Sequence, residues 1–114
     1  MSTQLRLNLV EGSVSFNFSP QAAQDLQKAI AQLMERLKAV SAKATTGKAS
    51  PQPPLEYRYT GDVFLEIFCN PNIWPTPFAA KVLITIRDAS IRLTTEAELT
   101  RLREDISQYL EQVS

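Results

Sequence analysis

The chain of 114 residues has no histidine, one cysteine and only three glycines. Without histidine there is no imidazole to act as a general acid or base, to activate a nucleophile or to ligate zinc. The single cysteine, Cys69, cannot form a disulfide within the chain. The glycines Gly12, Gly47 and Gly61 are too widely spaced for a loop that cradles phosphate. These absences exclude much familiar enzyme chemistry, and we expect neither a metal site nor a cofactor.

An excess of charge of one sign and long apolar runs are also missing. Twelve Lys and Arg residues balance twelve Asp and Glu residues, so no net field draws the protein to nucleic acid or to an anionic membrane. No stretch approaches the roughly 20 apolar residues of a membrane-spanning helix, and the first residues lack the apolar segment of a signal peptide. We therefore expect a cytoplasmic protein without membrane insertion.

The remaining composition is that of a globular protein. Hydrophobic residues make up 44% of the chain and charged residues 21%, which argues against a disordered or fibrous chain. A chain of 114 residues can also bury a core without disulfides. We expect residues 1–114 to form a single domain.

Apolar and polar residues alternate along residues 5–18, which predicts two half-buried strands. A two-residue turn at Glu11-Gly12 would place Leu9 opposite Val14, with all the apolar side chains of the hairpin on one face. Ser19-Pro20 then supplies an N-cap and a first helical residue. Apolar residues at spacings of three and four predict a helix over about 20–41.

The middle of the chain changes character twice. Residues 43–54 are rich in Ala, Thr, Ser, Gln and Pro and predict a flexible linker. Strand character returns over 55–69, with a bend at Thr60-Gly61-Asp62, and places Phe64 and Phe68 on one face. Three prolines within residues 70–77 predict a rigid loop, because proline cannot sit inside a sheet. We assign 55–79 to these middle strands and the loop.

The opening pattern recurs in the second unit, residues 82–113. Two alternating strands are joined by a turn at Arg87-Asp88, and the second strand directs Ile91 toward the core. Thr95-Glu96-Ala97-Glu98 has the spacing of a capping box, so a second helix is expected to begin there. Whether the units 5–41 and 82–113 are a true duplication stays open.

Together these elements predict an α+β fold. We expect an antiparallel sheet of about five to six strands, with two helices on one face, arranged as two strand–strand–helix units. The helical stripes would cover the sheet side that carries Leu5, Phe16, Ile84 and Ile91. The other side of the sheet would be open.

Phenylalanines on the open side would be unusual, and exposed apolar patches tend to mark partner contacts. We therefore expect a non-catalytic protein-interaction module that binds another protein chain, either as a homodimer or as a small accessory or regulatory subunit of a larger assembly. In an alternative arrangement, the loop around Trp74 folds over the phenylalanines as a small core, and both arrangements place Trp74 near this face. The predicted interaction surface consists of Phe64, Phe68, Ile73, Trp74, Arg6 and Arg92.

Two other functions use residues of the same region. Aromatic rings flanked by arginines can stack single-stranded nucleic acid, although the neutral chain and the carboxylate of Glu66 between the rings argue against it. A small enzyme would depend on Cys69 as a nucleophile or on Asp62 and Glu66 as an acid–base pair. Cys69 falls on the apolar side of its strand, where cysteine usually behaves as a small hydrophobe.

Overall fold

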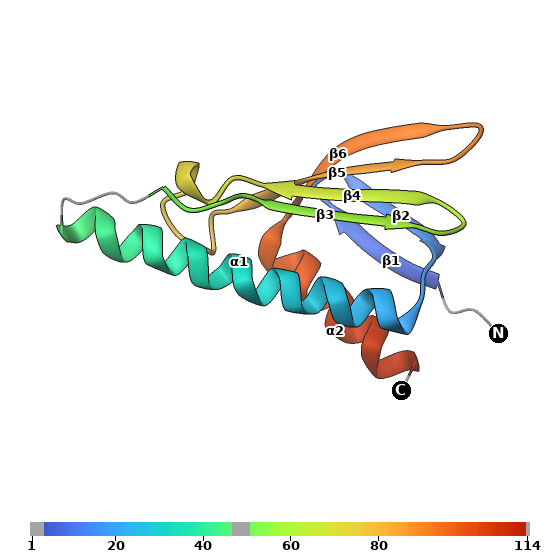
Figure 1. Ribbon diagram of the computed structural model, residues 1–114. Helices are drawn as coiled ribbons and strands as arrows, with labels where there is room; N and C mark the ends of the chain where they lie inside the picture. Colours follow the sequence, from blue (N-terminus) through green and yellow to red (C-terminus); the bar gives the residue numbers. More distant parts are fainter. Residues whose placement is uncertain (1–3, 47–50, 114) are drawn as a thin grey trace.

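The computed structural model describes residues 4–46 and 51–113. Within these residues the α+β fold is confirmed, with six strands and two α-helices (Figure 1). The elements are, in chain order, β1 (Gln4–Leu9), β2 (Gly12–Asn17), α1 (Pro20–Thr46), β3 (Leu55–Thr60), β4 (Phe64–Cys69), the 3-10 helix η1 (Pro71–Ile73), β5 (Lys81–Arg87), β6 (Arg92–Glu98) and α2 (Leu99–Val113).

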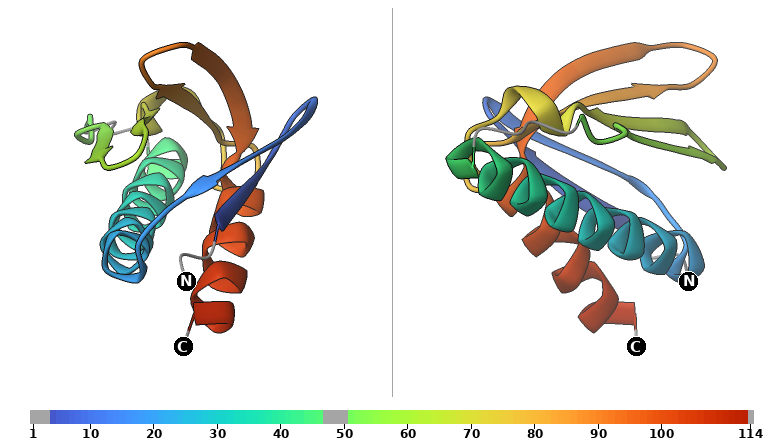
Figure 2. Two further views of the ribbon diagram at one scale, coloured as in Figure 1. Left: turned by 90° about the vertical axis from the view of Figure 1, so that its right-hand side faces the viewer. Right: turned by 60° about the vertical axis from the view of Figure 1, so that its left-hand side comes forward.

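The strands form two antiparallel sheets rather than the single sheet expected. The hairpin β1–β2 stands by itself, and the larger sheet has the order β3-β4-β5-β6. One backbone hydrogen bond connects the end of the hairpin to the larger sheet, from Val10 N to the carbonyl oxygen of Glu96 at 3.2 Å. The outer edge of β1 otherwise lies against α2, so a helix takes the place that a fifth strand pairing would need (Figure 2).

The hairpin turn is shifted by one residue from the predicted position. Val10 and Glu11 form the turn, and Leu9 pairs with Gly12 rather than with Val14. Gly12 directly follows the turn and has φ +114°, a conformation that residues with a side chain rarely adopt. The facing pairs therefore change by two residues. Because side chains alternate with a period of two, the same residues still face the core.

The β5–β6 connection is longer than the predicted turn at Arg87-Asp88. The Asp88 carboxylate accepts hydrogen bonds from the backbone N–H groups of Ser90 at 2.7 Å and Ile91 at 2.9 Å, which holds Asp88–Ile91 as a loop. Ile91 is 64% exposed and does not face the helices, contrary to the prediction. Arg92 instead opens β6 opposite Arg87.

Both predicted helix boundaries also need correction. Strand pairing continues to Lys81 and Glu98, so the expected capping box lies within β6 and α2 begins at Leu99. The helix α1 begins as predicted, with the Ser19 hydroxyl accepting from Ala22 N at 3.1 Å, but continues to Thr46. The sequence of 42–46 contains no glycine or proline, so nothing stops the helix at 41. The rest of the predicted linker includes residues 47–50, which lie outside the described residues.

Both helices lie on the same side of the four-stranded sheet, as Figure 1 shows. Their apolar stripes and the apolar face of the sheet meet in one core, to which the hairpin adds Leu5 and Phe16. Fully burying a side chain such as Leu or Ile contributes about 1.5–3 kcal/mol, so this shared core dominates the stability of the fold. The largest fully buried side chains are Leu5, Leu7, Leu26, Ile30, Leu33, Leu37, Leu65, Ile67, Ile84, Leu99, Leu102 and Ile106.

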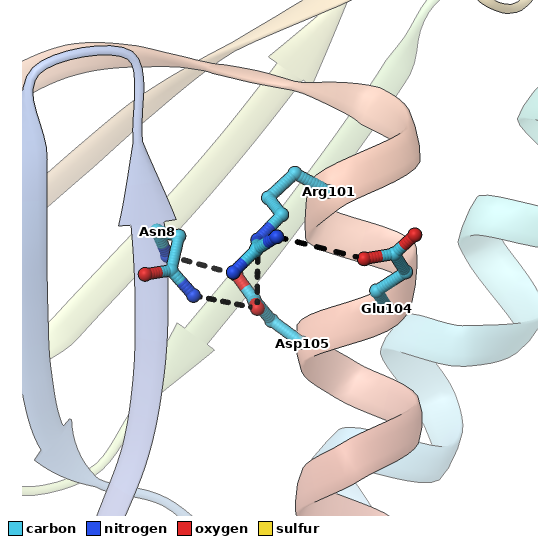
Figure 3. Close-up of polar contacts among 4 residues, drawn as sticks. All are labelled: Asn8, Arg101, Glu104 and Asp105. Carbon is cyan, nitrogen blue, oxygen red and sulfur yellow. Dashed lines mark hydrogen bonds and ion pairs between the residues drawn. The ribbon is translucent and has the colours of Figure 1, made fainter.

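A buried carboxylate on α2 ties the hairpin to the rest of the molecule (Figure 3). Asp105 accepts two hydrogen bonds from Asn8, one from the backbone N–H and one from the side-chain amide, each at 2.8 Å. Arg101 Nε lies 3.6 Å from the same carboxylate, whose side chain is 2% exposed. Asp105 thus satisfies a strand-edge N–H that would otherwise be buried without a partner. It joins residues that are 97 positions apart in the sequence.

We expect Asp105→Ala to lower the free energy of unfolding by about 2–4 kcal/mol, because it leaves two donors of Asn8 without an acceptor. Urea denaturation followed by circular dichroism measures the change. Glu104→Ala is the matched control, since the Glu104 side chain is 64% exposed on the next position of the same helix. Equal, small effects of the two substitutions would contradict the role assigned to Asp105.

Candidate interaction surface

The side of the four-stranded sheet that faces away from the helices carries alternate residues of all four strands. We call this side the open face. Strand pairing aligns its side chains in three rows that cross all four strands, and beyond the third row Lys81 of β5 faces Glu98 of β6. In order along the strands these are a first row of Thr60, Phe64, Arg87 and Arg92, a middle row of Arg58, Glu66, Thr85 and Thr94, and a third row of Glu56, Phe68, Leu83 and Glu96.

Two apolar side chains lie exposed near the centre of the third row. Phe68 and Leu83 are direct neighbours across β4 and β5, and they are 37% and 43% exposed. Together with Glu56, Arg58 and Glu66 they line a shallow hollow of about 260 Å³. Because β4 and β5 are the two inner strands of the sheet, this apolar pair sits on a rigid part of the fold.

Charged side chains cover part of the remaining open face. The guanidinium of Arg87 lies 4.4 Å from the centre of the Phe64 ring, a cation–π contact that leaves Phe64 half-buried. Arg58 Nε donates to the Glu66 carboxylate at 2.9 Å. The Arg87 side chain therefore occupies the space over Phe64 that the Pro-rich loop was considered to fill.

The loop that carries Trp74 turns to the helix side of the sheet. Trp74 packs against the core. Its buried indole N–H makes no hydrogen bond that meets the full geometric criteria, but it lies close enough to the Cys69 thiol to interact with it. The Ser41 hydroxyl of α1 donates to the Pro75 carbonyl at 2.7 Å, which holds the loop on that side. Trp74 therefore lies away from the open face, contrary to both expected arrangements. Ile73, in η1, is 66% exposed.

The structure brings together three of the six residues predicted for the interaction surface. Phe64 and Arg92 lie in the first row of the open face, and Phe68 lies in the third row. Arg6 pairs with Ser15 in the separate hairpin sheet, and Trp74 is partly buried against the core.

Sequence reasoning missed Leu83, the exposed neighbour of Phe68. Leu83 lies in the run Val82-Leu83-Ile84, where three apolar residues in succession hide the alternation of a half-buried strand. Only the pairing of β4 with β5 shows that Leu83 and Phe68 share a face. The charged residues of the third row, Glu56 and Glu96, were missed for the same reason, since their positions depend on strand order.

The groups considered for catalysis are buried or separated. Cys69 is 2% exposed, and burial raises the pKa of its thiol to about 11, despite the opposing effect of the Trp74 indole. Asp62 lies in the β3–β4 turn, where its carboxylate accepts from the Asn17 amide at 2.8 Å. Glu66 instead pairs with Arg58 on the open face. Asp62 and Glu66 are therefore held by different partners.

No protein-family model, curated protein or solved structure matches the chain. Across residues 4–46 and 51–113, no helix is both long enough and apolar enough to span a membrane. In the same residues, no three metal-ligating side chains come together as a candidate metal site. The open face is therefore the feature of the molecule from which a function can be inferred.

The buried position of Cys69 predicts an inert thiol. At pH 8 a thiol with a pKa of about 11 is ionised in roughly one molecule in a thousand, and burial also blocks access. We expect a water-soluble disulfide reagent to label Cys69 at least about 100-fold more slowly in the native protein than in urea. Absorbance of the released thiolate measures the rate. Rapid labelling of the native protein would show that Cys69 is accessible and would revive the nucleophile hypothesis.

Proposed function

We propose that the protein is a non-catalytic protein-interaction module whose open face binds another protein chain. The bound chain is either a second copy or a different protein, for which this chain serves as an accessory or regulatory subunit. The proposal places the protein in the cytosol, where a free thiol such as Cys69 stays reduced.

The observation that carries this proposal is the exposed pair Phe68 and Leu83. Isolated surface hydrophobics are common, but here two of them adjoin on the rigid inner strands, next to a hollow. Arginine and glutamate side chains surround the pair. An apolar centre within a polar rim is the usual composition of a protein–protein interface. Covering the exposed parts of the two side chains would contribute about 1 kcal/mol each.

The open face is less suited to single-stranded nucleic acid. Stacking requires a free ring surface, and Arg87 already covers Phe64. Phosphate contacts require unpaired cations, but Arg58 is paired with Glu66 and Arg87 lies over Phe64, which leaves Arg92 as the unpaired arginine of the open face. The open face carries as many glutamates as cations, so it has no net positive charge to attract the phosphate backbone.

The double substitution Phe68→Ser and Leu83→Ser tests the proposal. Native mass spectrometry of the full chain, gently purified from its own source, should show the unmodified protein with a second chain bound and the double variant as a bare monomer. Circular dichroism should show an unchanged helix content, because both side chains lie outside the core. Phe78→Ser is the matched control, since Phe78 is 80% exposed but precedes β5 and lies outside the open face.

Retention of the same assembly by the double variant would contradict the proposal, as would a bare monomer of the unmodified protein at every concentration. A retained oligonucleotide that dissociates as salt is raised would identify nucleic-acid binding instead, because apolar protein contacts do not weaken in this way.

A further inference from the structure

Charge on the open face is divided between its two ends. Arg87 and Arg92 lie in the first row, whereas Glu56 and Glu96 lie in the third. The rows are four residues apart along the strands, a distance of about 13 Å. Arg58 and Glu66, in the row between, neutralise each other. The open face therefore has a basic end and an acidic end with no net charge between them.

Two of these charges have no ion-pair partner among residues 4–46 and 51–113. Arg92 lies directly opposite Arg87 across β5 and β6, and adjacent like charges destabilise an antiparallel pair. Neither Arg92 nor the Glu96 carboxylate takes part in an ion pair with any residue of 4–46 or 51–113. Unpaired charges arranged in this way are complementary to a surface with the opposite order of charges.

We propose that the open face binds the open face of a second copy of this chain, about a two-fold axis that runs across the strands through the middle row. This inference rests on the proposed function and names its partner. Such an axis reverses the strand direction of one sheet relative to the other. The basic end of each copy then covers the acidic end of its partner.

The same axis aligns the apolar side chains. Phe64 of one copy, with the Arg87 guanidinium over its ring, lies over Phe68 of the other, and the stem of Arg87 lies over Leu83. Arg92 of one copy lies over Glu96 of the other, and this contact occurs twice because the interface is isologous. Stacked sheets pack about 10 Å apart, a separation that these side chains can fill.

A two-fold axis along the strands is the other way to stack two copies. It would place the first row over the first row in reversed strand order, so that Arg87 lies over Phe64 and the arginines of both copies gather at one end of the interface. Like charges gathered at one end of an interface repel one another and select against this arrangement. The charge pattern thus specifies a single orientation of the dimer.

Charge reversal at Arg92 and Glu96 tests the orientation. Positions 92 and 96 would both be acidic in the Arg92→Glu variant. Both positions would be basic in the Glu96→Arg variant. By sedimentation equilibrium of the purified full chain, each single variant should dimerise with a Kd at least about tenfold weaker than that of the unmodified protein. Arg103→Glu, on the exposed surface of α2, is the matched control and should leave the Kd unchanged.

An equimolar mixture of the two single variants should form a heterodimer whose Kd is within about threefold of the unmodified value. In that mixture both contacts become Glu against Arg, so each variant compensates for the other. Thermal unfolding of each variant checks that the fold is intact. Only an arrangement that brings residue 92 of one copy to residue 96 of the other predicts this recovery.

Three results would overturn the second-copy partner: a monomer at all concentrations, a dimer insensitive to both reversals, and weakening without recovery in the mixture. The proposed function would survive the first of these if the protein from its own source retains a different chain through Phe68 and Leu83. It would fail as well if that assembly also persists in the Phe68→Ser and Leu83→Ser variant.

Discussion

The fold depends on one constraint, which is that a four-stranded antiparallel sheet has two faces and this chain covers only one of them. The apolar side of β4 and β5, with Ile67 and Ile84 at its centre, needs cover from both helical stripes. Both helices therefore pack on that side, and the hairpin adds its own apolar face to the same core. The described residues contain no third α-helix that could cover the other side of the sheet. The open face is a direct consequence of how the core is built.

The position of the hairpin follows from the same constraint. With α2 occupying the space beside β1, the strand cannot join the larger sheet along its length, and its outward N–H groups need other acceptors. The Asp105 carboxylate supplies one acceptor and the Glu96 carbonyl another. A buried carboxylate with three polar neighbours is thus the element that fixes the first strand against the last helix. Burying a charge is tolerated here because its hydrogen bonds are satisfied.

Hydrophobic patterning in the sequence predicted most of the strands and helices, but it predicted less of how the strands pair and where the turns lie. Alternation located the strands, and spacings of three and four located both helices, because burial on one face imposes these periods. The hairpin turn lies one residue earlier than predicted, which changes the facing pairs by two residues. A pattern of period two is the same for both pairings, so the observed turn depends on the positive φ of Gly12. The loop at Asp88 depends on side-chain hydrogen bonds to the backbone, which hydrophobic patterning does not detect.

The candidate surface was predictable in part for a similar reason. Phe64 and Phe68 are read from one strand, but Leu83 and Glu96 join them only through strand pairing. Trp74 was misplaced because a proline-rich loop can turn to either side of the sheet, and its contact with α1 decides which. The open face is therefore a property of the assembled sheet rather than of any one segment.

Hydroxyl-radical footprinting as a function of protein concentration tests the central claim most directly, because it reports the solvent exposure of individual side chains. Our account predicts that Phe68 and Leu83 become protected as concentration rises through the dimer Kd. Phe78 and Ile91, which are 80% and 64% exposed away from the open face, should keep a constant rate of oxidation. Constant oxidation of Phe68 and Leu83 at concentrations where the protein is assembled would show that the open face is not the interface.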